Sequence, residues 1–345
     1  MSSGNTGNSF VIQNGASGTI SDLNIGVGGT SAQNNSVTFT GSGTTVDVTG
    51  SSEIRLLNGG TNGNELMFSD GVSVNAASTV IENTNGDGEN TFTMSGGTAS
   101  VLDVQVDGNN NVVVSGGDLN IGGSFTAGSG GSNIDFSGGT ITAAGSSLAD
   151  GITVGDGNNA TTATYVLDGG SHIADGPGIT LNSDGVLKGT GTVLGGGVTT
   201  AANSVVAPGN SIGTLTIDGT LDTTAGAVFE IELDAGFNAD SLDIDTWEAS
   251  GAGTDSLVFD FIDLGGAEAG TYTIATFNNE NGLTLDKLTE GNTPNGFSGD
   301  FVLNANSLEY DVNAIPEPLS AGFLGAVALS VAVIARRRRS ASARV

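Results

Sequence analysis

Three stretches of the chain, residues 92–97 (FTMSGG), 112–117 (VVVSGG) and 134–139 (IDFSGG), decide the expected fold. Each is a short apolar run followed by Ser-Gly-Gly. Such a run predicts a β-strand with one buried face, and glycine supplies the backbone angles of a sharp corner. One unit cannot bury its own apolar face, whereas stacked units form a continuous core.

The same unit recurs with a less regular sequence before and after these three stretches. Its closing glycines are Gly43, Gly71, Gly97, Gly117, Gly139, Gly170 and Gly185. The interval before Gly170 is the longest and the interval after it is the shortest. A spacing of about 20 to 30 residues suits one coil of a parallel β-helix, so we predict an all-β solenoid over residues 1–220. A series of β-sandwiches and a disordered Gly/Ser/Asn tract are the alternatives.

Composition removes several classes of protein. The 345 residues include 58 Gly, no Cys, one His and one Trp, and the formal net charge is −29. Without Cys the chain has no disulfide scaffold, no Cys-based zinc site and no thiol nucleophile. Without a basic surface on the body of the chain, we expect no nucleic-acid partner.

Basic residues are concentrated at the C-terminus. Five of the eight lie in the last ten positions, and residues 1–315 carry three basic residues against 36 acidic ones. Residues 319–335 (LSAGFLGAVALSVAVIA) carry no charge. As a helix they would span about 25 Å, the short end of what a bilayer core needs. We predict a transmembrane helix with a cytoplasmic C-terminus and an outward-facing body, a buried core helix being the alternative.

Residues 314–345 combine a Pro-Glu-Pro motif, an apolar span and an arginine cluster, and in this they resemble the PEP-CTERM sorting signal. The resemblance implies bacterial export and processing near residues 315–318 by a membrane-embedded exosortase. The mature protein is then expected at the cell surface or outside the cell. The expected partners are the exosortase and the lipid bilayer, with extracellular polysaccharide as a further candidate. The sorting residues are Pro316, Glu317 and Pro318, and the orientation cluster is Arg336, Arg337, Arg338 and Arg339.

An outward-facing body needs an export signal at its start. Residues 1–6 (MSSGNT) include no basic residue, and no apolar segment follows them. We expect the true start to lie upstream of Met1. The alternative is a C-terminally anchored protein whose acidic body stays inside the cell.

Residues 189–193 (GTGTV) and 207–217 (APGNSIGTLTI) resemble the repeat of autotransporter passengers and of many PEP-CTERM proteins. This resemblance implies a right-handed β-helix and surface display, and it implies no chemistry. From about residue 221 the predicted strands become longer and more aromatic. We expect residues 221–313 to form a terminal cap or a small β-domain, because an open solenoid end would expose unpaired strand edges.

Enzymes that cut polysaccharides are often β-helices, so a lyase or hydrolase is the main functional alternative. A lyase needs a cationic base or a bound cation, and no basic residue occurs between Arg55 and Lys188. No Asp-Asp pair occurs either. We predict that His172 is a surface loop residue and that Trp247 packs in the core rather than stacking on a sugar. The expected function is therefore non-enzymatic and structural or adhesive, without catalytic residues or cofactors.

One stretch resembles part of a calcium-binding loop. Asn83, Asn85, Asp87 and Gly88 match the start of an EF-hand loop, but Met94 stands where the loop requires Glu. Scattered acids such as Asp243 and Asp245 are expected to keep the rod soluble, loose Ca²⁺ binding being the alternative. We therefore predict no dedicated metal site.

Overall fold

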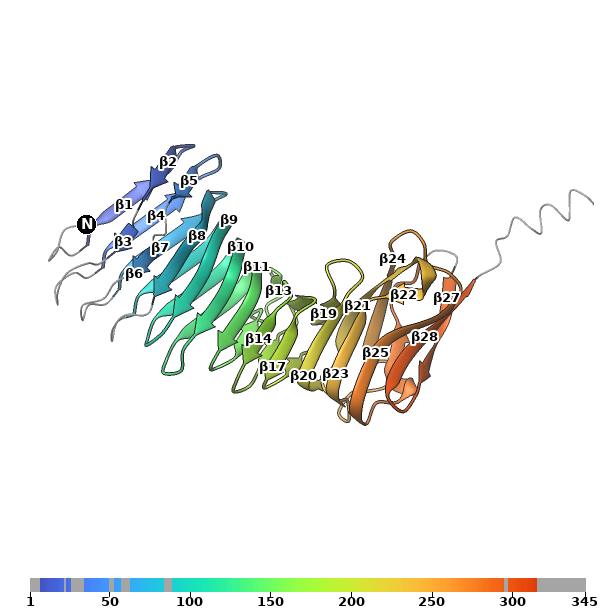
Figure 1. The fold of residues 1–345 in the computed structure, drawn as a ribbon. Coiled ribbons are helices and arrows are strands. Elements are labelled where there is room, and N and C mark those ends of the chain that lie inside the picture. Colours follow the sequence, from blue (N-terminus) through green and yellow to red (C-terminus); the bar gives the residue numbers. More distant parts are fainter. Residues whose placement is uncertain are drawn as a thin grey trace, which may run out of the picture.

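The computed structural model describes residues 7–21, 23–25, 34–49, 53–56, 63–83, 89–294 and 297–314. Within these residues all strands belong to one sheet, which winds into an elongated solenoid (Figure 1). The chain advances along the rod from β1 at one end to β28 at the other. The predicted all-β solenoid is confirmed, whereas the right-handed sense of its coil stays a prediction.

Strands of successive coils pair in parallel and form three ladders, here called the first, second and third faces. The first face stacks β1, β4 and β7, the second β2 and β5, and the third β3 and β6. The next four strands are long enough to turn the corners between faces. These N-terminal strands are β1 (Ser9–Ile12), β2 (Ser17–Ile20), β3 (Leu23–Ile25), β4 (Ser36–Thr40), β5 (Thr45–Val48), β6 (Glu53–Leu56), β7 (Glu65–Ser69), β8 (Ser73–Asn83), β9 (Thr91–Val106), β10 (Asn111–Ala127) and β11 (Asn133–Leu148).

The middle coils return to three separate strands per coil. They are β12 (Ile152–Val154), β13 (Ala163–Leu167), β14 (Ser171–Ala174), β15 (Ile179–Leu181), β16 (Gly185–Gly189), β17 (Thr192–Gly195), β18 (Val198–Thr200) and β19 (Val205–Pro208). The C-terminal elements are β20 (Thr214–Asp222), β21 (Ala227–Asp234), the 3-10 turn η1 (Ala235–Phe237), β22 (Asn238–Ala239), β23 (Ser241–Glu248), β24 (Leu257–Asp263), β25 (Gly270–Asn281), η2 (Leu285–Lys287), β26 (Leu288–Glu290), β27 (Phe297–Leu303) and β28 (Ser307–Ala314).

Pairing register confirms the predicted repeat length and explains its irregular part. Ser36 lies opposite Glu65, and Asn111 lies opposite Asn133, so that each coil has the length expected from the glycine spacing. The apolar run that precedes Gly170, residues 165–167, lies in β13 on the second face, where β13 pairs with β11 and β16. The earlier runs all lie on the first face, and so does the next one, in β15. This change of face produces the long interval before Gly170 and the short one after it.

Glycine is sterically required at the corner between the first and second faces. Gly97 and Gly117 have φ angles of 83° and 80°. A Cβ atom on Gly97 would lie 2.2 Å from the carbonyl oxygen of Val72, and one on Gly117 would lie 2.6 Å from that of Gly97. Both the backbone conformation and the closeness of the next coil therefore exclude a side chain.

A buried ladder of asparagines lies at the corner before the first face. The Asn35 carboxamide donates to Asn64 Oδ1 at 3.1 Å, and the Asn64 carboxamide donates to Asn90 Oδ1 at the same distance. The backbone N–H of Asn90 donates to Asn110 Oδ1, also at 3.1 Å. Each of these side chains is at most 2% exposed. The ladder thus satisfies most of these corner groups, which water cannot reach, although the carboxamide nitrogen of Asn90 has no hydrogen-bond partner.

Parallel pairing continues across residue 220 without a break. β20 pairs with β23, and β21 pairs with β24 over the whole length of β24. The described sheet then ends in antiparallel strands, because β28 pairs with both β25 and β27. The core of this part is rich in rings, such as Phe229 stacked on Phe259 with centroids 4.8 Å apart.

Candidate functional site

The predicted sorting residues lie outside the described residues. This applies to Pro316, Glu317 and Pro318, to residues 319–335 and to Arg336, Arg337, Arg338 and Arg339. The described chain ends at Ala314 in β28, at the opposite end of the rod from β1 (Figure 1). A search of the described residues finds no helix that is long and apolar enough to cross a bilayer. The transmembrane helix and its orientation stay predictions.

The prediction that His172 is a surface loop residue is wrong. The turn ends at Gly170, and Ser171 begins β14, so strand alternation places His172 inward and Ile173 outward. The imidazole is fully buried. Its Nδ1 lies 3.2 Å from Ser146 Oγ, and its Nε2 lies 2.8 Å from the carbonyl oxygen of Gly169.

This buried pair does not have the access that catalysis needs. Burial lowers the pKa of His172, and the Gly169 carbonyl assigns the proton of the neutral ring to Nε2. Nδ1 then accepts the hydroxyl hydrogen of Ser146. The Tyr165 ring packs edge-on against the imidazole, and burial raises the pKa of its hydroxyl to about 12. A serine beside a histidine can be an activated nucleophile, but here Ser146 is 5% exposed and His172 is not exposed.

Trp247 is a packing residue, as predicted. Its side chain is fully buried in β23, and its indole N–H donates to Thr223 Oγ1 at 3.0 Å. Its ring centroid lies 5.6 Å from that of Phe229 and 6.2 Å from that of Phe277. A sugar cannot reach this ring from solvent.

Of the candidate calcium ligands, Asn83, Asp243 and Asp245 lie among the described residues. Asn83 is buried, and its carboxamide donates to the carbonyl oxygens of Asn90 and Asn111. The other three positions of the EF-hand-like stretch lie outside the described residues. Asp243 and Asp245 accept hydrogen bonds from Thr276 and Asn278 of the next coil. In the described part of the chain, no three His, Asp or Glu residues gather as a metal site would require.

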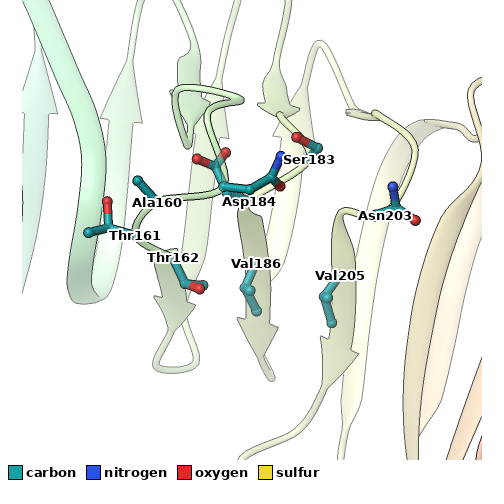
Figure 2. Close-up of a pocket in the computed structure, with 10 residues that line it drawn as sticks. Ala160, Thr161, Thr162, Ser183, Asp184, Val186, Asn203 and Val205 are labelled. Carbon is teal, nitrogen blue, oxygen red and sulfur yellow. The ribbon is translucent and has the colours of Figure 1, made fainter.

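A polar groove lies on the outer surface where three successive coils turn from the first to the second face (Figure 2). The β12–β13, β15–β16 and β18–β19 corners form it. Its volume is about 270 Å³, and it is lined by Asn159, Ala160, Thr161, Thr162, Ser183, Asp184, Gly185, Val186, Asn203 and Val205. Small-molecule sites usually enclose about 300–1,000 Å³. The groove is therefore slightly smaller than a typical small-molecule site.

Asp184 is the charged residue of the groove lining. Its Oδ1 accepts the backbone N–H of Gly157 at 2.9 Å, which holds the β12–β13 loop against the next coil. Asp156 lies beside it, and hydrogen bonds from Asn158 lower the pKa of the Asp156 carboxyl. The groove therefore offers an anionic edge together with hydroxyl and amide groups. Such a lining can bind neutral hydroxyl-bearing ligands such as sugars, and it repels polyanions.

The register also places several pairs of carboxylates opposite one another, and sequence inspection did not pair them. Glu230 in β21 and Asp260 in β24 are opposite one another on adjacent coils of the second face. Asp260 Oδ1 already accepts the backbone N–H of Asn292 at 2.6 Å. The only sequence signal for the pair is that each stands one residue after a buried aromatic residue, Phe229 and Phe259.

Comparison with protein-family models and with curated proteins finds no match to this chain.

Proposed function

We propose that this protein is an exported β-solenoid with a structural or adhesive role at the cell surface or in the extracellular matrix. An exosortase sorts and processes it through its C-terminal signal. The proposal rests on the order of three elements in the tail: Pro316-Glu317-Pro318, the apolar residues 319–335 and Arg336–Arg339. Arginines that stay in the cytoplasm would leave the acidic body outside.

The described fold suits such a role. Stacked coils form a long surface without needing an enclosed site, and a highly acidic exterior keeps the rods soluble and mutually repelling. The groove beside Asp184 offers hydrogen-bonding groups for the hydroxyls of extracellular polysaccharide. The right-handed coil implied by the autotransporter-like repeat belongs to the same proposal.

Replacing Pro316, Glu317 and Pro318 together with alanine tests the sorting signal. In cells that contain the exosortase, the variant should keep its tail and stay in the membrane fraction. Intact-mass measurement would then give a larger mature protein than the wild type. Asn313→Ala, an exposed substitution just upstream, is the matched control and should be processed normally. Equal mature masses for the wild type and the triple variant would refute the proposal.

A second candidate is an enzyme that acts on surface polysaccharide, and the Glu230–Asp260 pairing favours it. Glycoside hydrolysis usually requires two carboxyl groups that flank the glycosidic bond. This function predicts that wild-type protein releases reducing or unsaturated sugar ends from surface polysaccharide. Both Glu230→Gln and Asp260→Asn should abolish that release, whereas Asp218→Asn on a different face should not. The structural proposal predicts no release by any of these proteins.

A further inference from the structure

Among the exposed large apolar side chains of the C-terminal coils, which also include Leu285 and Val302, three lie in or beside the turns that follow β21 and β24. Phe237 is 50% exposed, Ile262 is 42% exposed and Leu264 is 45% exposed. Ile262 and Leu264 lie at the end of β24 and just after it, and Phe237 lies in the turn after β21, the strand that pairs with β24. The two turns touch, because a Cβ atom on Gly266 would lie 2.9 Å from the Cβ of Ala235. We call these three residues the end patch.

The exposed residue Phe237 has an unfavourable backbone conformation. Its φ angle is 63°, in the left-handed region that bulky residues rarely adopt. One side of the ring packs on Tyr272, with centroids 5.8 Å apart, and half of the side chain remains exposed. Strained residues of this kind concentrate at functional sites, where the surrounding structure holds them in place.

The end patch lies near the C-terminal end of the described chain. The Phe237 ring lies against Gly270, and Gly270 pairs with Val312 of β28. Ala314, two residues later, is the last described residue, and the apolar stretch begins at Leu319. Five residues of extended chain span at most about 18 Å. If residues 319–335 cross a bilayer, the end patch is therefore held close to its surface.

We propose that the end patch rests on the outer surface of the lipid bilayer and holds the C-terminal end of the rod against the membrane until the tail is cut. This inference rests on the proposed function, because residues 319–335 supply the anchor. Three half-exposed side chains bind a membrane weakly by themselves. The short tether makes their contact intramolecular and so raises its occupancy. Cutting the tether removes that advantage and releases the rod.

Charge decides which lipid the patch contacts. Asp263 lies between Ile262 and Leu264 in sequence, and its carboxylate accepts the backbone N–H groups of Gly265, Gly266 and Ala267. These three hydrogen bonds lower the pKa of Asp263 and keep it ionised. An ionised carboxylate in a strongly acidic protein is repelled by anionic lipids. We therefore expect contact with zwitterionic phosphatidylcholine, which has no net charge, and weaker contact when anionic phosphatidylglycerol is added.

The absence of Cys allows a direct test with single-cysteine variants of the full chain. In Leu264→Cys, an environment-sensitive fluorophore is attached to the new cysteine within the end patch. In Val11→Cys, the same fluorophore is attached in β1 at the far end of the rod, where Val11 is 45% exposed. Each protein is reconstituted into phosphatidylcholine vesicles, and flotation reports whether the tail anchors it. The fluorescence emission of the label at position 264 should shift to shorter wavelength and be quenched by brominated lipid. The emission of the label at position 11 should neither shift nor be quenched.

The outcomes separate the two proposals. If the protein floats but the label at position 264 reports an aqueous environment, the end-patch proposal is overturned and the membrane anchor is supported. Protein that does not float overturns both. Ile262→Ser in the labelled Leu264→Cys protein should reduce quenching at least twofold while flotation is unchanged. Since Ile262 is already 42% exposed, this variant is expected to fold. Unchanged quenching would also count against the patch.

Discussion

The N-terminal and C-terminal coils of this solenoid are stabilised in different ways. Among the described residues, the buried asparagines all lie between positions 35 and 110, where they hydrogen-bond from coil to coil. In the described chain beyond β19, the buried polar residues are Thr223 and Asp240, and the core contains Trp247 with Phe229, Phe259 and Phe277. Both regions stack rings in the core, since Phe39 and Phe68 are stacked in the N-terminal coils. The difference is that the N-terminal coils add a buried asparagine ladder at their corner, whereas the C-terminal coils rely on a larger aromatic cluster.

Trp247→Ala should have the largest effect on stability, because it removes a large ring from the aromatic core and leaves Thr223 Oγ1 without its hydrogen-bond donor. The free energy of unfolding should fall by about 3–5 kcal/mol. Hydrogen exchange should show the loss in β20 to β25 and not in β4 to β10, since a solenoid couples mainly to neighbouring coils. Equal loss of protection along the whole rod would remove the distinction between the two regions. Trp247→Phe, which keeps most of the ring contacts, is the matched control.

Gly97→Ala should destabilise the N-terminal coils by about 3 kcal/mol, because the added Cβ combines left-handed strain with a clash against the Val72 carbonyl. Gly15→Ala is the control, because Gly15 has a similar φ of 73° but nothing within 4 Å of the added atom. That variant should lose only about 1 kcal/mol. Thermal unfolding followed by circular dichroism measures both, and equal losses would show that steric crowding between coils does not matter.

Asn64→Ala should cost about 2 kcal/mol, because it leaves the N–H groups of Asn35 without their buried acceptor. Asn278→Ala in the C-terminal coils removes only an exposed hydrogen bond to Asp245. A surface substitution of this kind usually changes the free energy of unfolding by no more than about 0.5 kcal/mol. Denaturant unfolding compares the two. A similar cost at both positions would mean that the buried ladder contributes no more than a surface contact.

The smallest effects concern pH, and they have opposite signs in two regions. His172 has a lowered pKa in the folded state, so unfolded protein takes up a proton first as the pH falls below about 6.5, and stability decreases. Asp240, which accepts the N–H groups of Gly213 and Glu232, has a pKa that burial raises to about 7. Here the folded protein takes up the proton first, and stability increases as the pH falls from about 7 towards about 4.

Two variants separate these contributions. The change in melting temperature from pH 7.5 to pH 5 should become more positive in His172→Gln and more negative in Asp240→Asn. Parallel shifts in the two variants would contradict the assignment of opposite signs.

Sequence alone predicted the coils but not the contacts that hold them together. The apolar runs and Ser-Gly-Gly corners indicated the solenoid because strand alternation and glycine geometry are local properties. The asparagine ladder, the Glu230–Asp260 pairing and the end patch depend on which residues become neighbours one coil apart, and only the register supplies that. His172 was misplaced because its neighbours Gly170 and Ser171 resemble a turn, although β14 begins at Ser171.

The central claim is that the acidic rod faces outward while the terminal arginines stay inside the cell. It is tested most directly by labelling Val11→Cys and Ser342→Cys with a membrane-impermeant maleimide in exporting cells that lack the exosortase. We predict that Cys at position 11 reacts on intact cells and that Cys at position 342 reacts only after lysis. Reaction at position 342 on intact cells, or protection of position 11 until lysis, would contradict this orientation.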